Sequence, residues 1–113
     1  MQQKTPKLLY DIYDAGRLIQ EWTAEAKLQD YQRDRKLQAA VERCFEIIGE
    51  AIHRLSRYDE DTAAKPGDYP RIIAFRNVLS HGYDVLDHDH VWQVINRELP
   101  ELLKRTRHLL DQA

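Results

Sequence analysis

Apolar side chains recur along the chain at alternating steps of four and three residues, which is the spacing of one face of an α-helix. In the first such segment the recurring positions are Leu8, Ile12, Ala15, Ile19, Trp22 and Ala26. Thr5 and Pro6 precede them and suit a helix cap and a first turn. In the second segment the positions are Leu37, Val41, Cys44, Ile48, Ala51 and Leu55. The pattern predicts two amphipathic helices, with residues 28–31 as the connection between them.

The period stops at residues 58–70, where Pro66, Gly67 and Pro70 stand near a cluster of acidic residues, so we expect a loop there. Pro70 suits the first position of a third helix, because its missing N–H would have no partner there in any case. Gly82 suits the end of that helix, since glycine readily adopts the left-handed conformation that often follows a last turn. A third helix is therefore predicted between these two residues.

A fourth apolar stripe runs to the C-terminus, and Asp87 is placed to cap it. Its positions are Val91, Ile95, Leu99, Leu102 and Leu109. Pro100 interrupts the stripe and, because it lacks a backbone donor, either kinks one long helix or starts a fifth. No segment shows the alternation of a strand, so we predict an all-α bundle of four or five helices, forming a single domain over residues 1–113. The stripes need partners on more than one side, which a homodimer supplies, although a closed monomeric bundle accounts for the pattern about as well.

The composition narrows the class of protein. A chain of 113 residues is long enough to bury a core in one domain. Its single cysteine, Cys44, cannot form an internal disulfide, and the N-terminus has no apolar run typical of a signal peptide or a membrane span, so we expect a cytoplasmic protein. Charged residues make up 32% of the chain, yet the formal net charge is −2, which argues against a protein that coats nucleic acid through bulk positive charge. Any contact with nucleic acid is expected to be local.

Four side chains that handle protons or phosphate stand together at the predicted end of the third helix, in the stretch RNVLSHGY. They are Arg76, Asn77, His81 and Tyr83. Arg76 and His81 are five residues apart, which leaves them about 140° apart around a helix axis. They face one cleft only if the helix ends before His81, or if Arg76 of one chain faces His81 of another across a two-fold axis.

These residue types suit the cleavage of RNA without a metal ion. Histidine exchanges protons near neutral pH, and the arginine fork pairs with phosphate oxygens. Because the 2′-hydroxyl of RNA can attack the adjacent phosphate, the protein needs only to move protons and to stabilise negative charge on the phosphorus centre. Asn77 could add a hydrogen bond to the phosphate or to the histidine ring, and Tyr83 offers a hydroxyl as a ligand contact or as an acceptor for modification. The same residues could instead satisfy the free carbonyl groups of a helix end, where His81 would be well placed against the helix dipole, and the residues alone leave both interpretations open.

Other polar groups have a simpler interpretation. The stretch from Asp87 to His90 contains only metal-ligand residue types, but neighbouring residues at a helix start point in different directions, so capping acids and a polar first turn are favoured over a metal site. Glu50 is expected to be an exposed helix glutamate, although it could orient His81 or Arg76. Basic residues near the end of the second helix and near the C-terminus fit solvated helix faces, or else extend a phosphate-binding rim. They are His53, Arg54 and Arg57, and Lys104, Arg105, Arg107 and His108.

The spacing of Arg76, His81 and Tyr83 resembles the Arg-x4-His-x-Tyr motif of the HEPN superfamily (higher eukaryotes and prokaryotes nucleotide-binding), and in particular the HepT-like toxins of prokaryotic toxin–antitoxin pairs. The likeness extends over nearly the whole chain. It includes, in order, the blocks LLYDIYDAGRLI, FEIIGEAIHRLS, YPRIIAFRNVLSHGYDVLD and VWQVINRELPELL. Four blocks in the order of the family are far more specific than a motif of three residues.

The resemblance implies an all-helical protomer whose homodimer forms a cleft between two copies of the motif, and an endoribonuclease toxin that needs no metal or other cofactor. Arg76 and His81 would be the catalytic pair, Asn77 the polar neighbour, and Tyr83 the residue to which a cognate antitoxin, a nucleotidyltransferase of the MNT type, transfers AMP from ATP. AMP brings bulk and negative charge into a cleft built for RNA phosphate, so it would compete for Arg76. The alternatives are a non-catalytic HEPN binding module that pairs with the nucleotidyltransferase, and a plain helical scaffold.

Overall fold

Helices make up all of the regular structure in the part of the chain that is described, which comprises residues 4–59, 62 and 87–112 of the computed structural model. In chain order these are α1 (Thr5–Thr23), α2 (Leu28–Arg33), α3 (Arg35–Tyr58), α6 (His88–Gln93), the π-helix η1 (Val94–Glu98) and α7 (Leu99–Gln112). The all-α prediction is confirmed. The third helix, predicted between Pro70 and Gly82, lies outside the described residues and stays a prediction.

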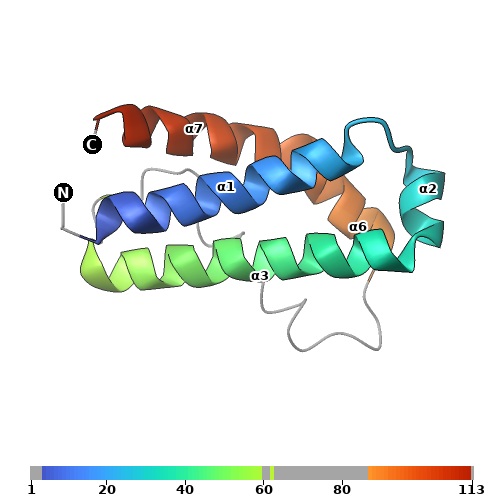
Figure 1. Cartoon of the computed structure of the whole chain (residues 1–113), viewed down its shortest axis with the longest axis horizontal. Coiled ribbons are helices and arrows are strands. Elements are labelled where there is room, and N and C mark those ends of the chain that lie inside the picture. Colours follow the sequence, from blue (N-terminus) through green and yellow to red (C-terminus); the bar gives the residue numbers. More distant parts are fainter. Residues whose placement is uncertain (1–3, 60–61, 63–86, 113) are drawn as a thin grey trace.

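The long helices lie side by side in an antiparallel arrangement, with α1 in contact with both α3 and α7 (Figure 1). The short helices α2 and α6 lie together at one end of the molecule, where α1 ends and α3 begins (Figure 1). The described helices therefore form a three-helix layer that is closed at one end by α2 and α6.

The apolar stripe predicted for the second helix forms the centre of the core. Val41, Ile48 and Leu55 of α3 are fully buried, and Cys44 and Ala51 are nearly so. Helix α3 spans Arg35–Tyr58, and its cap is Asp34, whose carboxylate accepts a hydrogen bond from the backbone N–H of Leu37 at 3.0 Å. The period of 3.6 residues thus predicts this helix and its buried face.

The first predicted stripe is buried near its start, but its end extends past the helix, and Trp22, predicted to pack in the core or at a dimer surface, is not in the core of the single chain. Helix α1 stops at Thr23, so Ala26 lies beyond it, and Trp22 is 41% exposed. The buried position in this turn is Thr23, whose hydroxyl donates to the carbonyl of Ile19 at 2.8 Å. Because α1 packs against both α3 and α7, its buried face is wider than one stripe, and Trp22 lies at the edge of that face.

Thr5 also differs from its predicted role as a cap. It is the first residue of α1, it is fully buried, and its hydroxyl donates to Oδ2 of Asp59, just past the end of α3, at 3.0 Å. Pro6 occupies the first turn of α1, as predicted. The start of α1 is therefore joined to the end of α3 by a side-chain hydrogen bond that bridges 54 residues of sequence.

Residues 28–31, predicted as a connection, belong instead to the helix α2. The carboxylate of Asp30 accepts a hydrogen bond from the backbone N–H of Lys27 at 2.9 Å, which stabilises the first turn. Tyr31 is fully buried, and its carbonyl accepts a hydrogen bond from Nε2 of Gln38 at 2.7 Å. A helix of six residues with one buried side chain shows no apolar period, so the sequence pattern could not reveal it.

Helix α7 approaches α1 closely at Gly16. A Cβ at this position would lie 2.3 Å from Cδ2 of Leu103, well inside the ordinary contact distance between carbon atoms. Glycine is unfavourable in the middle of a helix, and the close approach of α7 explains why it stands here.

Pro100 sits just inside α7, and the helical run from His88 to Gln112 continues through it with a bend (Figure 1). Of the two alternatives, the structure therefore has the kinked long helix. The bend is η1, in which the N–H of Leu99 donates to the carbonyl of Val94, five residues earlier. A wider π turn fits before proline, because the proline ring would clash with a carbonyl in a regular α turn. The side chain of Asn96 donates to the carbonyl of Trp92 at 2.8 Å and helps to satisfy this turn. Among the described helices, none has the length and apolar character needed to cross a membrane.

Candidate functional site

The predicted site residues Arg76, Asn77, His81 and Tyr83 all lie outside the described residues, so their geometry stays a prediction. What the structure does show is how the chain is held before and after residues 63–86.

On the N-terminal side, Asp59 accepts hydrogen bonds from the hydroxyl of Thr5 at 3.0 Å and from the backbone N–H of Thr62 at 3.2 Å. On the C-terminal side, Asp87 caps α6, as predicted, because its carboxylate accepts from the backbone N–H groups of Asp89 and His90 at 3.0 and 3.4 Å. Both ends of the segment that carries the motif are thus fixed by a carboxylate.

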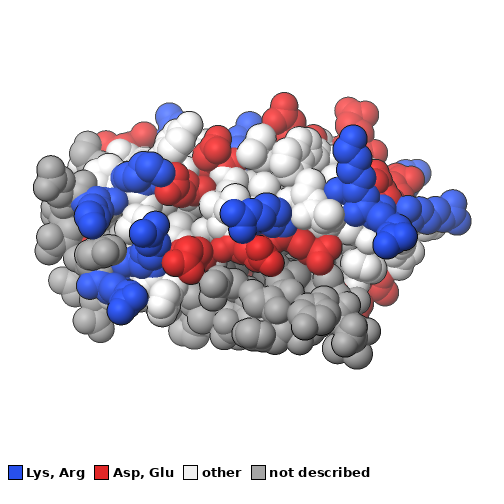
Figure 2. All heavy atoms as spheres, turned by 60° about the horizontal axis from the view of Figure 1, so that its bottom comes forward, with Lys and Arg blue, Asp and Glu red and all other residues white. Residues whose placement is uncertain are grey.

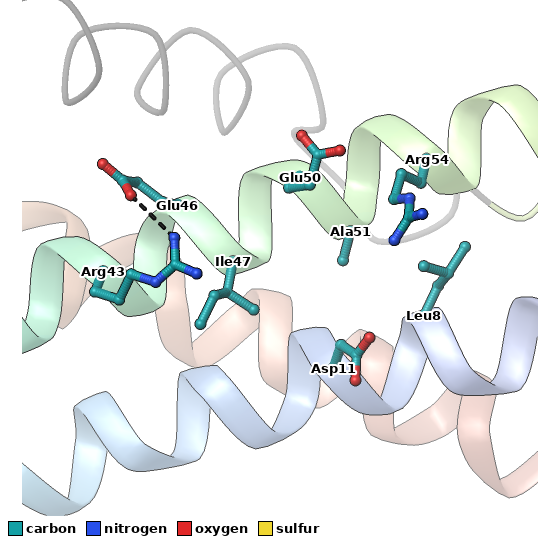
Figure 3. A pocket seen from close by; sticks show the side chains of 8 residues that line it. All are labelled: Leu8, Asp11, Arg43, Glu46, Ile47, Glu50, Ala51 and Arg54. Atoms are coloured by element: carbon teal, nitrogen blue, oxygen red, sulfur yellow. Dashed lines mark hydrogen bonds and ion pairs between the residues drawn. The ribbon is translucent and has the colours of Figure 1, made fainter.

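A groove of about 450 Å³ lies between α1 and α3 (Figure 3). It is lined by Leu8 and Asp11 of α1 and by Arg43, Glu46, Ile47, Glu50, Ala51 and Arg54 of α3. In Figure 3, Arg54 and Ile47 extend from α3 toward α1, whereas Glu46 and Glu50 point to the outer side of α3. The expectation that Glu50 is an exposed helix glutamate is confirmed.

Most charges in this groove are paired along the helices. Arg43 contacts Glu46 at 3.4 Å, and Asp11 contacts Nζ of Lys7 at 2.7 Å. Arg54 forms no ion pair with any residue that the structure describes. Because the lining of the groove includes three carboxylates and two guanidinium groups, the groove as a whole is not a phosphate cradle, and its Arg54 end suits an anion best.

A row of three glutamates, Glu42, Glu46 and Glu50, follows one face of α3 at steps of four residues. Burial raises the pKa of Glu42, and repulsion from Glu46 adds to this rise, while the nearby His88 opposes it. Stacked carboxylates of this kind disfavour one another on a helix surface.

Lysine and arginine side chains gather at both ends of the face shown in Figure 2, one of which is the end where α1 begins and α3 ends. The cations carried by these two helix ends are Lys4, Lys7, Arg54 and Arg57, all of them exposed. This cluster keeps open the interpretation that the end of α3 extends a phosphate-binding rim.

The basic residues of α7 mostly fit a solvated helix face. Arg105 pairs with Glu101 at 2.8 Å, and Arg107 pairs with Asp111 at 3.2 Å, each one helical turn away. The guanidinium group of Arg107 also lies 5.7 Å from the ring centre of Tyr13, which joins α7 to α1. These contacts give the charges a structural role.

The stretch from Asp87 to His90 is a helix start, and its acids are engaged by protein groups. Asp87 is the cap, and Asp89 accepts a hydrogen bond from Nε2 of Gln32 at 2.6 Å. Within residues 4–59, 62 and 87–112, no group of three His, Cys, Asp or Glu side chains is arranged to hold a metal ion.

Sequence patterns missed the junction between α2 and α6, which is the most distinctive polar feature of the described structure. Tyr31 lies against His88 and Trp92, with ring centres 5.9 and 5.5 Å apart. The hydroxyl of Tyr31 and Nδ1 of His88 are buried and find no hydrogen-bond partner in the part of the chain that the structure describes. Burial is also the main cause that raises the pKa of Tyr31, with the charge of Glu42 adding to it. The available sequence signal was a lone aromatic residue in a polar stretch, which predicts nothing about its partner.

Comparison with known proteins finds similarity over most of the chain. The model of the family described as "Ribonuclease HepT-like" matches residues 12–109. A probable ribonuclease HepT of Thermococcus cleftensis is 31% identical over 111 residues, covering 90% of this chain and 92% of that protein. Candidate RNases of Methanocaldococcus jannaschii and Caldanaerobacter subterraneus are 30% and 29% identical, covering 85% and 96% of this chain and 87% and 97% of the respective relatives. No solved structure gives a significant match.

Proposed function

The chain belongs to the HepT-like ribonuclease family, and from this premise we propose that it is a metal-independent endoribonuclease, the toxin of a prokaryotic HepT/MntA-type toxin–antitoxin pair. The observation that carries the proposal is the motif Arg76-x4-His81-x-Tyr83, which falls inside the matched residues 12–109. The names of the relatives support an enzyme of the RNase type.

In the proposed reaction the 2′-hydroxyl of a ribose attacks the adjacent phosphorus. A bond forms between the 2′-oxygen and phosphorus, the bond from phosphorus to the 5′-oxygen breaks, and the products are a cyclic phosphate and a free 5′-hydroxyl. His81 takes the proton from the 2′-hydroxyl or gives one to the leaving oxygen. Arg76 stabilises the negative charge that builds up on the phosphorus centre, and Asn77 holds the phosphate or the histidine ring.

The site is proposed to lie in a cleft between two copies of the chain. Arg76 and His81 do not share a helix face, so either a helix end or a second subunit has to bring them together. A two-fold axis places the same motif of both subunits face to face, which gives one cleft two sets of catalytic groups.

Tyr83 is proposed as the residue through which the enzyme is switched off. In this reaction the phenol oxygen of Tyr83 attacks the α-phosphorus of ATP on a cognate nucleotidyltransferase of the MNT type, and pyrophosphate leaves. The attached AMP brings a negative phosphate close to His81, two residues away, and competes with RNA for Arg76.

The enzyme proposal is tested by RNA cleavage in the presence of EDTA, with the wild type compared with His81→Ala and Arg76→Ala. We expect each variant to lose at least about a hundredfold in rate, because a positioned proton-transfer group typically contributes about 10²- to 10⁴-fold. Equal cleavage by wild type and His81→Ala, or no cleavage by folded and unmodified wild type, overturns the proposal. If cleavage is absent but the chain still binds its nucleotidyltransferase in a pull-down, the non-catalytic binding module is the correct alternative.

The modification is tested separately by mass spectrometry after incubation with the nucleotidyltransferase and ATP. We expect one AMP adduct on Tyr83 in the wild type and none in Tyr83→Phe. An adduct on another tyrosine, such as the exposed Tyr10, removes Tyr83 from this role.

A further inference from the structure

Helix α6 starts directly after residues 63–86, and the way in which its first turn is held has consequences for those residues. Apart from its own continuation into η1, the main described neighbour of α6 is α2 (Figure 1). Among the described elements, the first turn of α6 is therefore contacted mainly by a helix of only six residues, Leu28–Arg33.

Two neighbouring residues of α2 contact α6 in different ways. The ring of Tyr31 packs edge-on against His88, with an angle of 76° between the ring planes, and in a tilted arrangement against Trp92, one helical turn further on. Next to it, Nε2 of Gln32 donates to Oδ1 of Asp89 at 2.6 Å. Three residues in the first turn and a half of α6 are thus contacted from α2.

Helix α2 is itself fixed to α3. The carbonyl of Tyr31 accepts a hydrogen bond from Nε2 of Gln38, a buried residue of α3, at 2.7 Å. Tyr31 is fully buried, so its ring cannot leave this position without opening the end of the core. The contacts form a chain from α3 through α2 to α6.

The hydroxyl of Tyr31 does not contribute to these contacts between α2 and α6. It is buried and has no hydrogen-bond partner among the described residues, and the same holds for Nδ1 of His88 on the neighbouring ring. Because a buried polar atom without a partner is unfavourable, the hold on α6 comes from the packing of the aromatic ring and from the bond between Gln32 and Asp89.

We propose that Tyr31 and Gln32 are positioning residues, through which α2 fixes the first turn of α6 and with it the exit of the chain from the Arg76–Tyr83 motif. Asp87 follows Tyr83 by four residues, so their Cα atoms lie within about 14 Å of each other whatever path the chain takes. A shift at the start of α6 is therefore passed to the motif over a short length of chain. The effect on cleavage rests on the proposed function, whereas the stabilisation of α6 by its contacts with α2 does not.

The stabilisation of α6 by α2 is tested by amide hydrogen exchange, followed separately for α6 and for α1. We expect Tyr31→Ala to accelerate exchange in α6 at least about tenfold more than in α1, because local opening affects the unit that loses its contact. Gln32→Ala should act in the same direction and more weakly. Tyr31→Phe keeps the ring and should match the wild type.

The control is Leu109→Ala, which opens the core near the end of α7, far from α6 (Figure 1). It should not single out α6, so its exchange pattern shows what general destabilisation looks like. The positioning role is overturned if Tyr31→Ala accelerates exchange evenly, as the control does, or if Tyr31→Phe behaves like Tyr31→Ala.

The consequence for cleavage is tested with the same variants, at a temperature where each is fully folded by circular dichroism. We expect Tyr31→Ala to lower kcat at least about tenfold, since a misplacement of about 1 Å can lower a rate about a hundredfold, while Tyr31→Phe restores it and Leu109→Ala leaves it unchanged. An unchanged kcat in Tyr31→Ala, with α6 opened, overturns the link to the motif. If the wild type does not cleave RNA, the proposed function fails, and the exchange result still decides whether α2 holds α6.

Discussion

Replacing Gly16 with alanine tests the close contact between α1 and α7 at Leu103. The added Cβ would lie 2.3 Å from Cδ2 of Leu103 and 3.1 and 3.2 Å from its Cγ and Cδ1, whereas unstrained carbon contacts are about 3.5–4.0 Å. Leu103 is only 4% exposed, so its side chain has to move against the packing around it to make room for the added Cβ. Overpacking of this kind costs about 1–3 kcal/mol.

The same substitution also has a favourable part, because alanine stabilises a helix interior by about 1 kcal/mol relative to glycine. We therefore expect Gly16→Ala to lower the free energy of unfolding by about 1 kcal/mol in the wild type. In a Leu103→Ala background the clashing atoms are gone, and Gly16→Ala should instead raise that free energy by about 1 kcal/mol. The sign of one substitution is predicted to reverse with the background, which a general loss of stability cannot produce.

Urea unfolding followed by circular dichroism measures all four proteins, at one protein concentration so that any subunit association affects them equally. Leu103→Ala alone should lose about 2–5 kcal/mol, which sets the scale of the cycle. If Gly16→Ala is stabilising in both backgrounds, α7 does not approach α1 as closely as described. Since α7 continues from α6 and η1, the register of the whole C-terminal run would then be in question.

Three further predictions concern single groups. Asp87→Ala should lower the free energy of unfolding, measured in urea, by about 1 kcal/mol, because α6 loses its cap. Asp87→Asn should keep most of the stability, since asparagine also caps helices, and an equal loss in both variants would contradict the capping role. Because burial raises the pKa of Glu42, the folded state binds a proton there more tightly than the unfolded state, so this group favours folding at low pH and loses that contribution as pH rises through its folded pKa. Glu42→Gln should therefore raise the melting temperature at pH 7 and approach the wild type as pH falls toward 4, and a lower melting temperature at pH 7 would show that attraction to His88 dominates. Burial, with the charge of Asp14, also raises the pKa of the Cys44 thiol, so iodoacetamide should label Cys44 far more slowly in the native protein than in urea, and equal rates by mass spectrometry would show that the thiol is accessible.

How far the sequence predicts this fold depends on the length of each element. Helix α3 has more than six turns, so each core position is supported by others at the same spacing, and its face is predicted correctly. Helix α2 has fewer than two turns, and Tyr31 is its only buried residue, so no period exists to detect. The pattern predicts that Trp22 packs in the core or at a subunit surface. Which of the two holds depends on the width of the face that α1 buries, and α7, from the other end of the chain, helps to set that width. A local sequence pattern does not predict contacts of this kind between distant helices.

For the candidate site, too, the sequence predicts one part and leaves another open. The chemistry of Arg76, His81 and Tyr83 follows from residue types and from family likeness, and these need no coordinates. Whether Arg76 and His81 meet within one subunit or across a two-fold axis depends on contacts between elements or between chains, which the spacing of five residues does not determine. The positioning role of α2 was likewise beyond pattern analysis, because Tyr31 and His88 are 57 residues apart and each is unremarkable in its own stretch.

The two junctions on either side of the motif segment lie far apart along α3. His88 is close enough to Glu42 to affect its pKa, so α6 begins beside the first half of α3, whereas Asp59 follows the last turn of that helix. The 17 residues from Glu42 to Asp59 correspond to about 26 Å along the helix axis. Contacts this far apart usually act additively on stability when no network joins them. A loss at Thr5, which holds Asp59, should therefore add to a loss at Tyr31 in the free energy of unfolding, while both act on the one segment that carries Arg76 and His81.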